Sequence, residues 1–225
     1  MKISIIIPCY NEEKTLGKIV DKVLQFKLYE KEIIIIDDCS VDNTSSIIKE
    51  LKNNFSEIKS IRHEKNYGKG AAIRSGIEIS NSDIILIQDA DLEYDPMDYP
   101  KLLNPFTNTD ADVVYGSRFL GGDYVRLHFF WHHIANKLLT TLSNIFTNLN
   151  MTDMETGYKL FKSKTIKSIQ LKENSFGIEP EITMKLAKKK FIFYEVPISY
   201  RGRSYDEGKK IGLRDAFKAV YCIFK

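Results

Sequence analysis

The chain has 225 residues, of which 43% are hydrophobic, 28% are charged and 12 are glycine. This composition is typical of a globular protein and excludes a disordered or collagen-like chain. The formal net charge of +3 comes from 33 basic and 30 acidic residues, so it gives no indication of a nucleic-acid partner. Three cysteines without a C-x-x-C pair exclude a disulfide framework and a zinc site, and they indicate reduced, cytoplasmic thiols.

Short aliphatic runs bounded by polar turns recur through the first half of the chain. They do not alternate apolar with polar residues, which is typical of strands buried on both faces and therefore parallel. Segments with helical spacing lie between them, so the order predicts an α/β fold with a doubly wound, mostly parallel central sheet flanked by helices. The predicted strands are Ile3–Ile7, Ile33–Ile36, Ile58–Ile61, Ile84–Ile87 and Val113–Tyr115, and the predicted helices are Glu12–Phe26, Asn43–Leu51 and Ala71–Ile79.

The sequence changes in character near residue 120. Helical patterns cover Leu127–Leu149, Ile178–Ala187 and Ile211–Phe224, and Phe191–Tyr200 has the pattern of a strand or hairpin arm. We find no linker, so we expect one domain over residues 1–225, in which residues 121–225 form a helical and β extension of residues 1–120. The sequence predicts no transmembrane helix, and the N-terminal apolar run is too short for a signal peptide.

An acidic segment follows the fourth predicted strand, at the sheet edge where ligands bind in such folds. Asp89 and Asp91 can present hard oxygens to one Mg²⁺ or Mn²⁺ ion, with Glu93 as a third acid, and such an ion neutralises a departing diphosphate. A D-x-D tripeptide alone also arises by chance and in helix N-caps. Asp95 before Pro96 is better explained as an N-cap. The position after a buried strand favours a metal site for the other acids.

Two further loops at this edge carry residues suited to a nucleotide. Asp37 and Asp38 end the second strand, where a carboxylate can accept a hydrogen bond from a base or a ribose; one of them is expected to be structural. Gly68 and Lys69 open the third helix, where glycine lets the backbone approach a phosphate and the helix N-terminus adds positive potential. A plain turn is the alternative. Neither a Walker A loop nor G-x-G-x-x-G is present, which disfavours dinucleotide binding.

Taken in order, these motifs resemble those of the family 2 glycosyltransferases. The resemblance covers roughly the first 120 residues and is closest to the branch of dolichyl- and polyprenyl-phosphate mannose synthases. It implies a GT-A fold and sugar transfer with inversion. The segments that carry it are Ile3–Glu13, Ile33–Thr44, Asn66–Gly76, Asp83–Pro96 and Asp112–Phe119, extended by Thr152–Phe161 and Tyr200–Ile211.

The resemblance also implies roles for individual residues. Asp89 and Asp91 would handle the ribose, metal and diphosphate, and Glu93 stands where the mannose synthases often have glutamine. The nucleoside would be contacted by Pro8, Tyr10, Glu12, Asp37 and Asp38.

Basic residues of the chain are implied to face the sugar or an acceptor phosphate. Arg118 and Arg126 are two of them. A basic segment near the C-terminus matches a mobile acceptor loop of the branch and would clamp phosphate groups, although a solvated loop is the alternative. Its cations are Arg201, Arg203, Lys209 and Lys210.

Glu179 and Glu181 lie near the position where many family members with hydroxyl acceptors carry a catalytic carboxylate. A hydroxyl acceptor needs a general base, whereas a phosphate acceptor is already an anion and does not. The alternative is an acidic first helical turn that interacts favourably with the helix dipole.

Aromatic residues at Leu127–Ile134 and the amphipathic pattern of Ile211–Phe224 suit a lipid interface, and core packing with a homodimer face is the alternative. We therefore expect a peripheral enzyme on the cytoplasmic membrane face. It would transfer a hexosyl unit from a GDP- or UDP-sugar to a lipid-linked acceptor, with polyprenyl phosphate as the first candidate. The rivals are transfer to a glycerolipid or glycan hydroxyl, a nucleotidyltransferase, and a non-catalytic nucleotide-sugar-binding protein.

Overall fold

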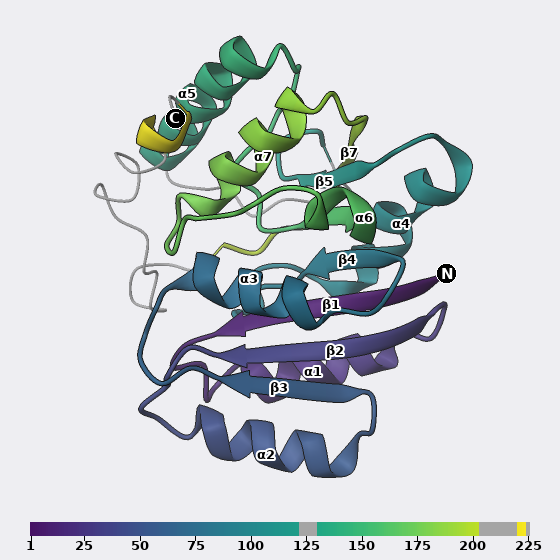
Figure 1. Cartoon of the computed structure of the whole chain (residues 1–225), viewed down its shortest axis with the longest axis vertical. Coiled ribbons are helices and arrows are strands. Elements are labelled where there is room, and N and C mark those ends of the chain that lie inside the picture. The colour runs from purple at the N-terminus through teal and green to yellow at the C-terminus, as the bar shows by residue number, and fades with distance from the viewer. Residues whose placement is uncertain (122–129, 203–219, 224–225) are drawn as a thin grey trace.

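The computed structural model of the chain describes residues 1–121, 130–202 and 220–223 (Figure 1). Seven strands of this part form one sheet in the order β3-β2-β1-β4-β6-β5-β7. All neighbouring strands are parallel except β6, which runs antiparallel to both β4 and β5. The strands are β1 (Lys2–Cys9), β2 (Glu30–Asp37), β3 (Ile58–Arg62), β4 (Ile84–Ile87), β5 (Val113–Ser117), β6 (Lys159–Lys162) and β7 (Phe193–Pro197).

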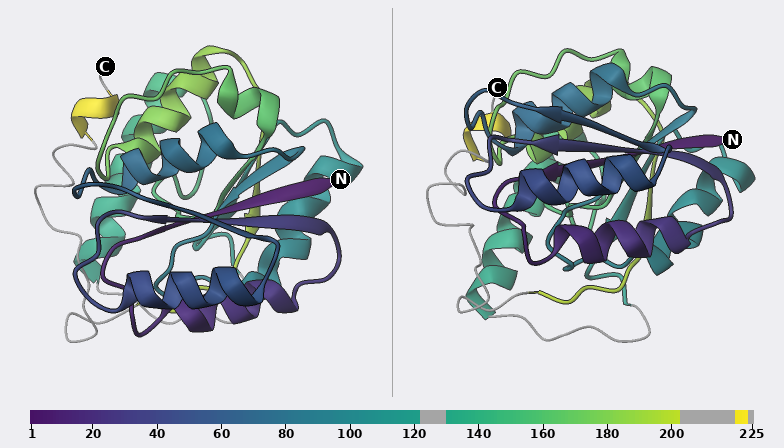
Figure 2. Two further views of the ribbon diagram at one scale, coloured as in Figure 1. Left: turned by 60° about the horizontal axis from the view of Figure 1, so that its bottom comes forward. Right: turned by 90° about the horizontal axis from the view of Figure 1, so that it is seen from below.

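Helices cover both faces of this sheet, which gives the fold three layers (Figure 2). Side chains of α1, α2 and α4 pack on one face, and those of α3, α5, α6 and α7 pack on the other. The helices are α1 (Leu16–Gln25), α2 (Thr44–Asn54), α3 (Lys69–Ile79), α4 (Tyr99–Asn108), α5 (Phe130–Thr147), α6 (Ser163–Lys167) and α7 (Ile178–Lys188), with a 3₁₀ turn η1 (Pro96–Asp98) before α4.

The unbroken isoleucine runs explain why the central strands are buried on both faces. In β1, Ile5 and Ile7 belong to the core under α1, whereas Ile6 belongs to the core under α3. Ile5 pairs with Ile33 of β2 in parallel register. Branched side chains fit this doubly covered, pleated surface, so the predicted parallel strands are confirmed.

Most predicted elements are present, with shifted ends. The first helix begins at Leu16 instead of Glu12, because the preceding residues form a turn in which Thr15 donates its N–H to the Glu12 carbonyl at 3.1 Å. The predicted N-cap role of Asp95 is confirmed, since its side chain accepts the N–H of Met97 at 3.1 Å. Most of Ile211–Phe224 lies outside the described residues, as does the start of the predicted helix from Leu127.

The unpredicted strand β6 has the largest effect on the site. It inserts between β4 and β5, so a segment from the second half of the chain enters the middle of the sheet. Lysines at both of its ends hide its strand pattern in the sequence. Because β6 carries Thr152–Tyr158 to the carboxyl end of β4, it brings these residues beside the acidic segment.

α5 has a long apolar face that other described residues do not cover. Phe130 is 65% exposed, Trp131 76%, Leu138 68% and Ile145 70%. Within the described residues, no helix is both long and apolar enough to cross a bilayer.

Candidate functional site

The predicted site residues gather at one edge of the sheet, because β1, β2, β4 and β5 all end there. Pro8, Asp37, Asp89 and Arg118 lie in or directly after these strand ends. The predicted crevice edge is therefore the place where the structure assembles the polar residues.

Asp37 is bonded to the protein itself. Its carboxylate accepts the N–H of Ser40 at 2.8 Å, the hydroxyl of Ser45 at 2.6 Å and the guanidinium of Arg62 at 2.8 Å. This buried group holds the loop after β2 against β3 and the start of α2, which is the structural role expected of one member of the pair.

Asp38 is equally engaged, which the sequence did not predict. Its carboxylate accepts the N–H groups of Tyr67 and Gly68 at 2.9 and 2.7 Å, and it lies 2.7 Å from Nδ1 of His63. The other ring nitrogen of His63 lies 2.9 Å from the Ser75 hydroxyl. Asp38 thus organises the loop that leads into α3, and a nucleoside contact by it stays a prediction.

The glycines before and within α3 allow another segment of the backbone to pack closely against the start of this helix. A Cβ on Gly68 would lie 2.3 Å from the carbonyl oxygen of Asn174, and one on Gly70 would lie 2.4 Å from that of Glu173. Ala71 donates its N–H to the Asn174 carbonyl at 3.2 Å. These glycines admit the backbone of residues 173–174. The predicted approach of Gly68 to a phosphate or ribose stays a prediction.

Lys69 connects the segment after β4 with the start of α7. Its ammonium lies 2.9 Å from Oδ1 of Asp89, beyond β4, and 3.0 Å from Oε1 of Glu179, in the first turn of α7. Burial alone would lower the pKa of Lys69, but the two carboxylates raise it well above its usual range. The second oxygen of Glu179, Oε2, is buried and has no hydrogen-bond partner among the described residues.

The three acids predicted to share a metal ion do not converge in this structure. Asp89 faces Lys69, Asp91 accepts the N–H of Glu93 at 3.1 Å, and the Glu93 carboxylate accepts the hydroxyl of Tyr200 at 2.5 Å. Across residues 1–121, 130–202 and 220–223, no three His, Cys, Asp or Glu side chains are placed to hold one ion.

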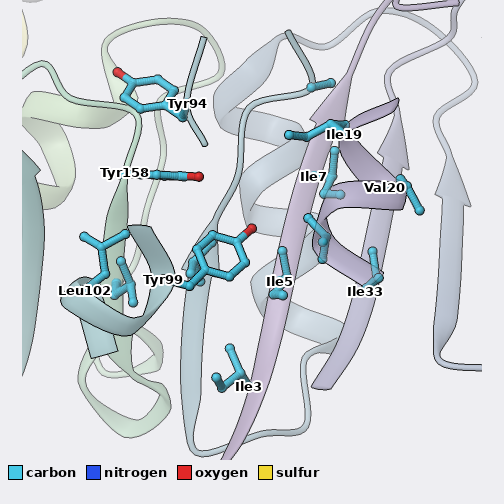
Figure 3. Packing of buried hydrophobic residues seen from close by; sticks show 14 of the residues in the cluster. Ile3, Ile5, Ile7, Ile19, Val20, Ile33, Tyr94, Tyr99, Leu102 and Tyr158 are labelled. Carbon is cyan, nitrogen blue, oxygen red and sulfur yellow. The ribbon is translucent and has the colours of Figure 1, made fainter. Parts of the chain in front are cut away.

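A buried polar residue fixes the start of the acidic segment. Gln88 is fully buried, and its side-chain oxygen accepts the hydroxyls of Tyr99 and Tyr158, each at 2.7 Å. Tyr94, Tyr158 and Tyr99 form a column of rings beside the sheet (Figure 3), with 4.7 Å between the first two centroids and 5.9 Å between the second and third. This packing holds the backbone from which Asp89 projects.

Arg118 is buried against an aspartate that the sequence did not single out. Its Nε and Nη2 atoms each lie 2.7 Å from an oxygen of Asp153, in a bidentate pair, and its guanidinium lies 5.1 Å from the ring centroid of Tyr200. Such a fork fixes the guanidinium plane. Any contact of Arg118 with sugar or phosphate would have to use its remaining N–H groups.

Two more charged residues lie in the interior beside this pair. Burial raises the pKa of Glu155 to about 7, with the charge of Glu179 acting in the same direction. Burial lowers the pKa of Lys159 to about 8, against the attraction of these carboxylates. The Lys159 ammonium donates to the carbonyl of Met154 at 2.8 Å and to that of Thr156. A buried charge lowers the free energy of unfolding unless it is paired, so a cluster of charged side chains is unusual in a protein core.

Glu181 differs from Glu179 in its surroundings. Its carboxylate accepts the N–H groups of Lys172 and Glu173 and the ammonium of Lys185, at 2.6 to 3.0 Å. Burial alone would raise the pKa of Glu181, but these hydrogen bonds, that of Lys185 foremost, lower it. The geometry therefore favours a structural role for Glu181 and leaves Glu179 as the predicted base.

Some of the remaining predicted residues lie within the described part of the chain, and the others lie outside it. Tyr10 is 37% exposed at the end of β1, and the Glu12 N–H bonds to the Thr44 hydroxyl at 2.9 Å. Arg201 is exposed, and its N–H donates to the Glu93 carbonyl at 2.9 Å, which places it next to the acidic segment. The predicted residues that lie outside the described residues are Arg126, Arg203, Lys209 and Lys210.

Sequence reasoning missed Asp153, Glu155 and Lys159 as members of this cluster. A signal was present, since the segment that extended the family resemblance carries these three charged residues. Their position beside the acidic segment depends on β6, which the pattern of apolar residues did not predict.

Comparison with known proteins identifies the family. The model of "Glycosyl transferase family 2" matches residues 4–169. The dolichol-phosphate mannosyltransferase of Pyrococcus furiosus is 30% identical over 94% of this chain, which spans 61% of that protein's length. The UDP-N-acetylglucosamine–dolichyl-phosphate N-acetylglucosaminyltransferase of Methanococcus voltae is 30% identical over 97% of this chain and 93% of its own.

Solved structures support the fold. Glucosyl-3-phosphoglycerate synthase from Mycobacterium tuberculosis, in complex with Mn²⁺, UDP and glucosyl-3-phosphoglycerate, superposes with a TM-score of 0.75 at 17% identity, covering 99% of this chain and 78% of that one. The expected GT-A fold is confirmed. The chain belongs to glycosyl transferase family 2 and is a glycosyltransferase.

Proposed function

We propose that this glycosyltransferase moves a hexosyl unit from a GDP- or UDP-linked sugar to a lipid-linked acceptor, polyprenyl phosphate in the first place, with inversion at the anomeric carbon. The observation that carries the proposal is the position of Asp89 and Asp91 at the carboxyl end of β4, with Arg118 and Arg201 beyond them. The names of both curated relatives support it, because each describes transfer to a dolichyl phosphate.

A divalent ion, Mg²⁺ or Mn²⁺, is part of the proposal. Glucosyl-3-phosphoglycerate synthase binds UDP together with Mn²⁺ or Mg²⁺. The residues present fit such an ion without a third acid, since Mg²⁺ is usually held by one or two carboxylates together with substrate phosphates. Asp89 and Asp91 offer such oxygens, and Asp89 already holds a cation, the Lys69 ammonium. When bound, the ion would stabilise the charge of the departing diphosphate. Asp89 and Asp91 would hold it.

The acceptor phosphate needs binding and orientation, not deprotonation. Its oxygen is already an anion, so the protein's task is to hold it in line with the anomeric carbon. Arg118 is rigidly positioned for this by Asp153, and exposed Arg201 is positioned through its backbone bond to Glu93.

A hydroxyl acceptor is the second candidate, and one observation favours it. Glu179 has one buried oxygen, Oε2, without a hydrogen-bond partner among the described residues, as a base awaiting a substrate hydroxyl would have. Its other oxygen, Oε1, is already engaged in an ion pair with Lys69 at 3.0 Å. We therefore rank the phosphate acceptor first.

We further propose that the exposed face of α5 rests on the cytoplasmic surface of a membrane and gives access to the lipid acceptor. This face combines Trp131 and Phe130 with aliphatic residues, and the whole helix has one charged residue, Lys137. Aromatic side chains beside aliphatic ones suit the boundary between head groups and acyl chains.

The decisive experiment measures transfer from a panel of GDP- and UDP-sugars to polyprenyl phosphate and, separately, to diacylglycerol. We expect product with the phosphate acceptor and release of nucleoside diphosphate, not pyrophosphate. Asp91→Asn should lower kcat at least about 100-fold, because the variant would no longer hold the metal ion that neutralises the departing diphosphate. Asp95→Asn, in the same loop but acting as a cap, is the matched control and should keep activity. Full activity of Asp91→Asn, or transfer to diacylglycerol alone, would contradict the proposal.

A further inference from the structure

Lys69 occupies an unusual position for a lysine at the start of a helix. Its side chain is 18% exposed, and its ammonium contacts both oxygens of Asp89, at 2.9 and 3.2 Å, together with Oε1 of Glu179 at 3.0 Å. One side chain thus joins the ends of β4, α3 and α7.

The backbone holds Lys69 in this place. Gly68 has a φ of 100° that other residues rarely adopt, and Gly70 packs directly on the carbonyl of Glu173. Arg74, one turn further along α3, donates to the Glu173 carbonyl and to the side chain of Asn174. The start of α3 is therefore clamped to the segment before α7, and the ammonium is not free to leave with a mobile loop.

The ammonium and a divalent ion would compete for the same carboxylate. A metal ion bound to Asp89 would lie within a few ångströms of the Lys69 charge, where two cations repel strongly because little water screens them. Both ions can be near Asp89 only if an additional negative charge accompanies the metal. The diphosphate of the donor supplies such a charge.

We propose that Lys69 is a resident counter-ion of Asp89, which suppresses metal binding in the absence of nucleotide and turns to the donor diphosphate when the metal binds. This inference rests on the proposed metal-dependent function and deepens it. It makes metal and nucleotide binding mutually favourable, because each removes an obstacle to the other, and such coupling is reciprocal.

The test measures Mn²⁺ affinity by electron paramagnetic resonance, with and without UDP, for the wild-type chain, Lys69→Met and Lys69→Arg. Without UDP, Lys69→Met should bind Mn²⁺ roughly tenfold more tightly than the wild type, because the competing charge is gone. Lys69→Arg keeps the charge and should resemble the wild type. The tightening of Mn²⁺ binding by UDP should shrink in Lys69→Met. Unchanged or weaker Mn²⁺ binding by Lys69→Met without UDP overturns the inference.

A second variant covers a possible folding defect. Lys69→Met leaves Asp89 and Glu179 without their cation, so Lys69→Met/Glu179→Gln removes one of these charges and should also bind Mn²⁺ more tightly than Glu179→Gln alone. Equal affinity of these two proteins overturns the inference even if the single variant is unstable. Absence of Mn²⁺ binding by the wild type in the presence of UDP would instead contradict the proposed function.

Discussion

Gly157 shows how a residue without a side chain shapes the proposed donor site around Asp89. A Cβ at this position would lie 2.3 Å from Oδ2 of Asp89 and 2.8 Å from Cε2 of Tyr94. Its N–H donates to the Tyr94 hydroxyl at 2.7 Å. The position requires glycine because of this close approach, and the carboxylate of Asp89 rests against it.

We expect Gly157→Ala to displace Asp89 and to lower kcat/KM about 100-fold, since a shift near 1 Å in a positioned group has an effect of this size. The free energy of unfolding should fall by about 1–3 kcal/mol from overpacking. Steady-state kinetics and urea unfolding measure the two effects. Gly17→Ala in α1 is the control, because no atom lies within 4 Å of the added methyl group, and it should keep activity. Equal activity of the two variants would show that the Gly157 contact is unimportant.

The residues of the donor site were predictable to different degrees. The position of Asp89 and Asp91 at the sheet edge was predictable because they follow an uninterrupted apolar strand, and their contact with the donor stays a prediction. The pairing of Lys69 with Glu179 depends on how α3 packs against the segment before α7, and these residues are 110 positions apart in the sequence. Local patterns carry no information about such a contact.

At the level of elements, α5 stands apart because its outer face is apolar and uncovered by other described residues. Exposed apolar patches of this extent mark contact surfaces. The helix is 18 residues long, about 27 Å at 1.5 Å per residue, so it can lie along a membrane surface over its whole length.

We predict that the double variant Trp131→Ser/Leu138→Ser reduces binding to vesicles of phosphatidylcholine and phosphatidylglycerol at least about fivefold, because it removes two large apolar side chains from the surface that we propose faces the membrane. Flotation on a density gradient measures the effect. Met97→Ser is the control, since Met97 is 80% exposed and lies in η1, before α4, which packs on the opposite face of the sheet from α5. If vesicle binding is unchanged and light scattering shows that a dimer has become a monomer, the face is a homodimer interface instead.

Strands were predicted correctly where the run of apolar residues was uninterrupted. The isoleucine runs predicted β1, β2 and β4 because doubly buried strands need no polar residue. β6 was missed because its first residue, Lys159, is charged and still buried. Its ammonium donates to two carbonyl groups of the same chain, so a buried strand position carries a residue type that is typical of the surface. α4 was indicated only by Asp95, which caps the 3₁₀ turn η1 directly before it.

Across the whole molecule, charge in the interior makes stability depend on pH. The pKa of Glu155 is raised from 4.5 to about 7 by burial and by Glu179, so the folded state binds a proton more tightly than the unfolded chain does. The stabilising contribution is fully present below pH 4.5 and is lost as the pH rises through 7. The shift of Lys159 acts above pH 8, outside this window.

We therefore expect the free energy of unfolding of the wild type to fall by roughly 1–3 kcal/mol between pH 5 and pH 7.5, relative to Glu155→Gln, which cannot ionise. Urea unfolding at several pH values measures this difference. Glu78→Gln, on the exposed side of α3, is the control and should follow the wild type. Parallel pH curves for the wild type and Glu155→Gln would contradict the assignment.

The insertion of β6 also constrains how the molecule can form. β4 and β5 do not pair with each other, and each reaches the other only through β6, which begins at Lys159, more than 40 residues after β5 ends at Ser117. A nascent chain that has emerged only to residue 120 therefore exposes an unpaired edge on β4 and has no docking place for β5. The late, long-range closure of the sheet is expected to be slow, so the ribosome-bound first half is the state that most needs protection from aggregation.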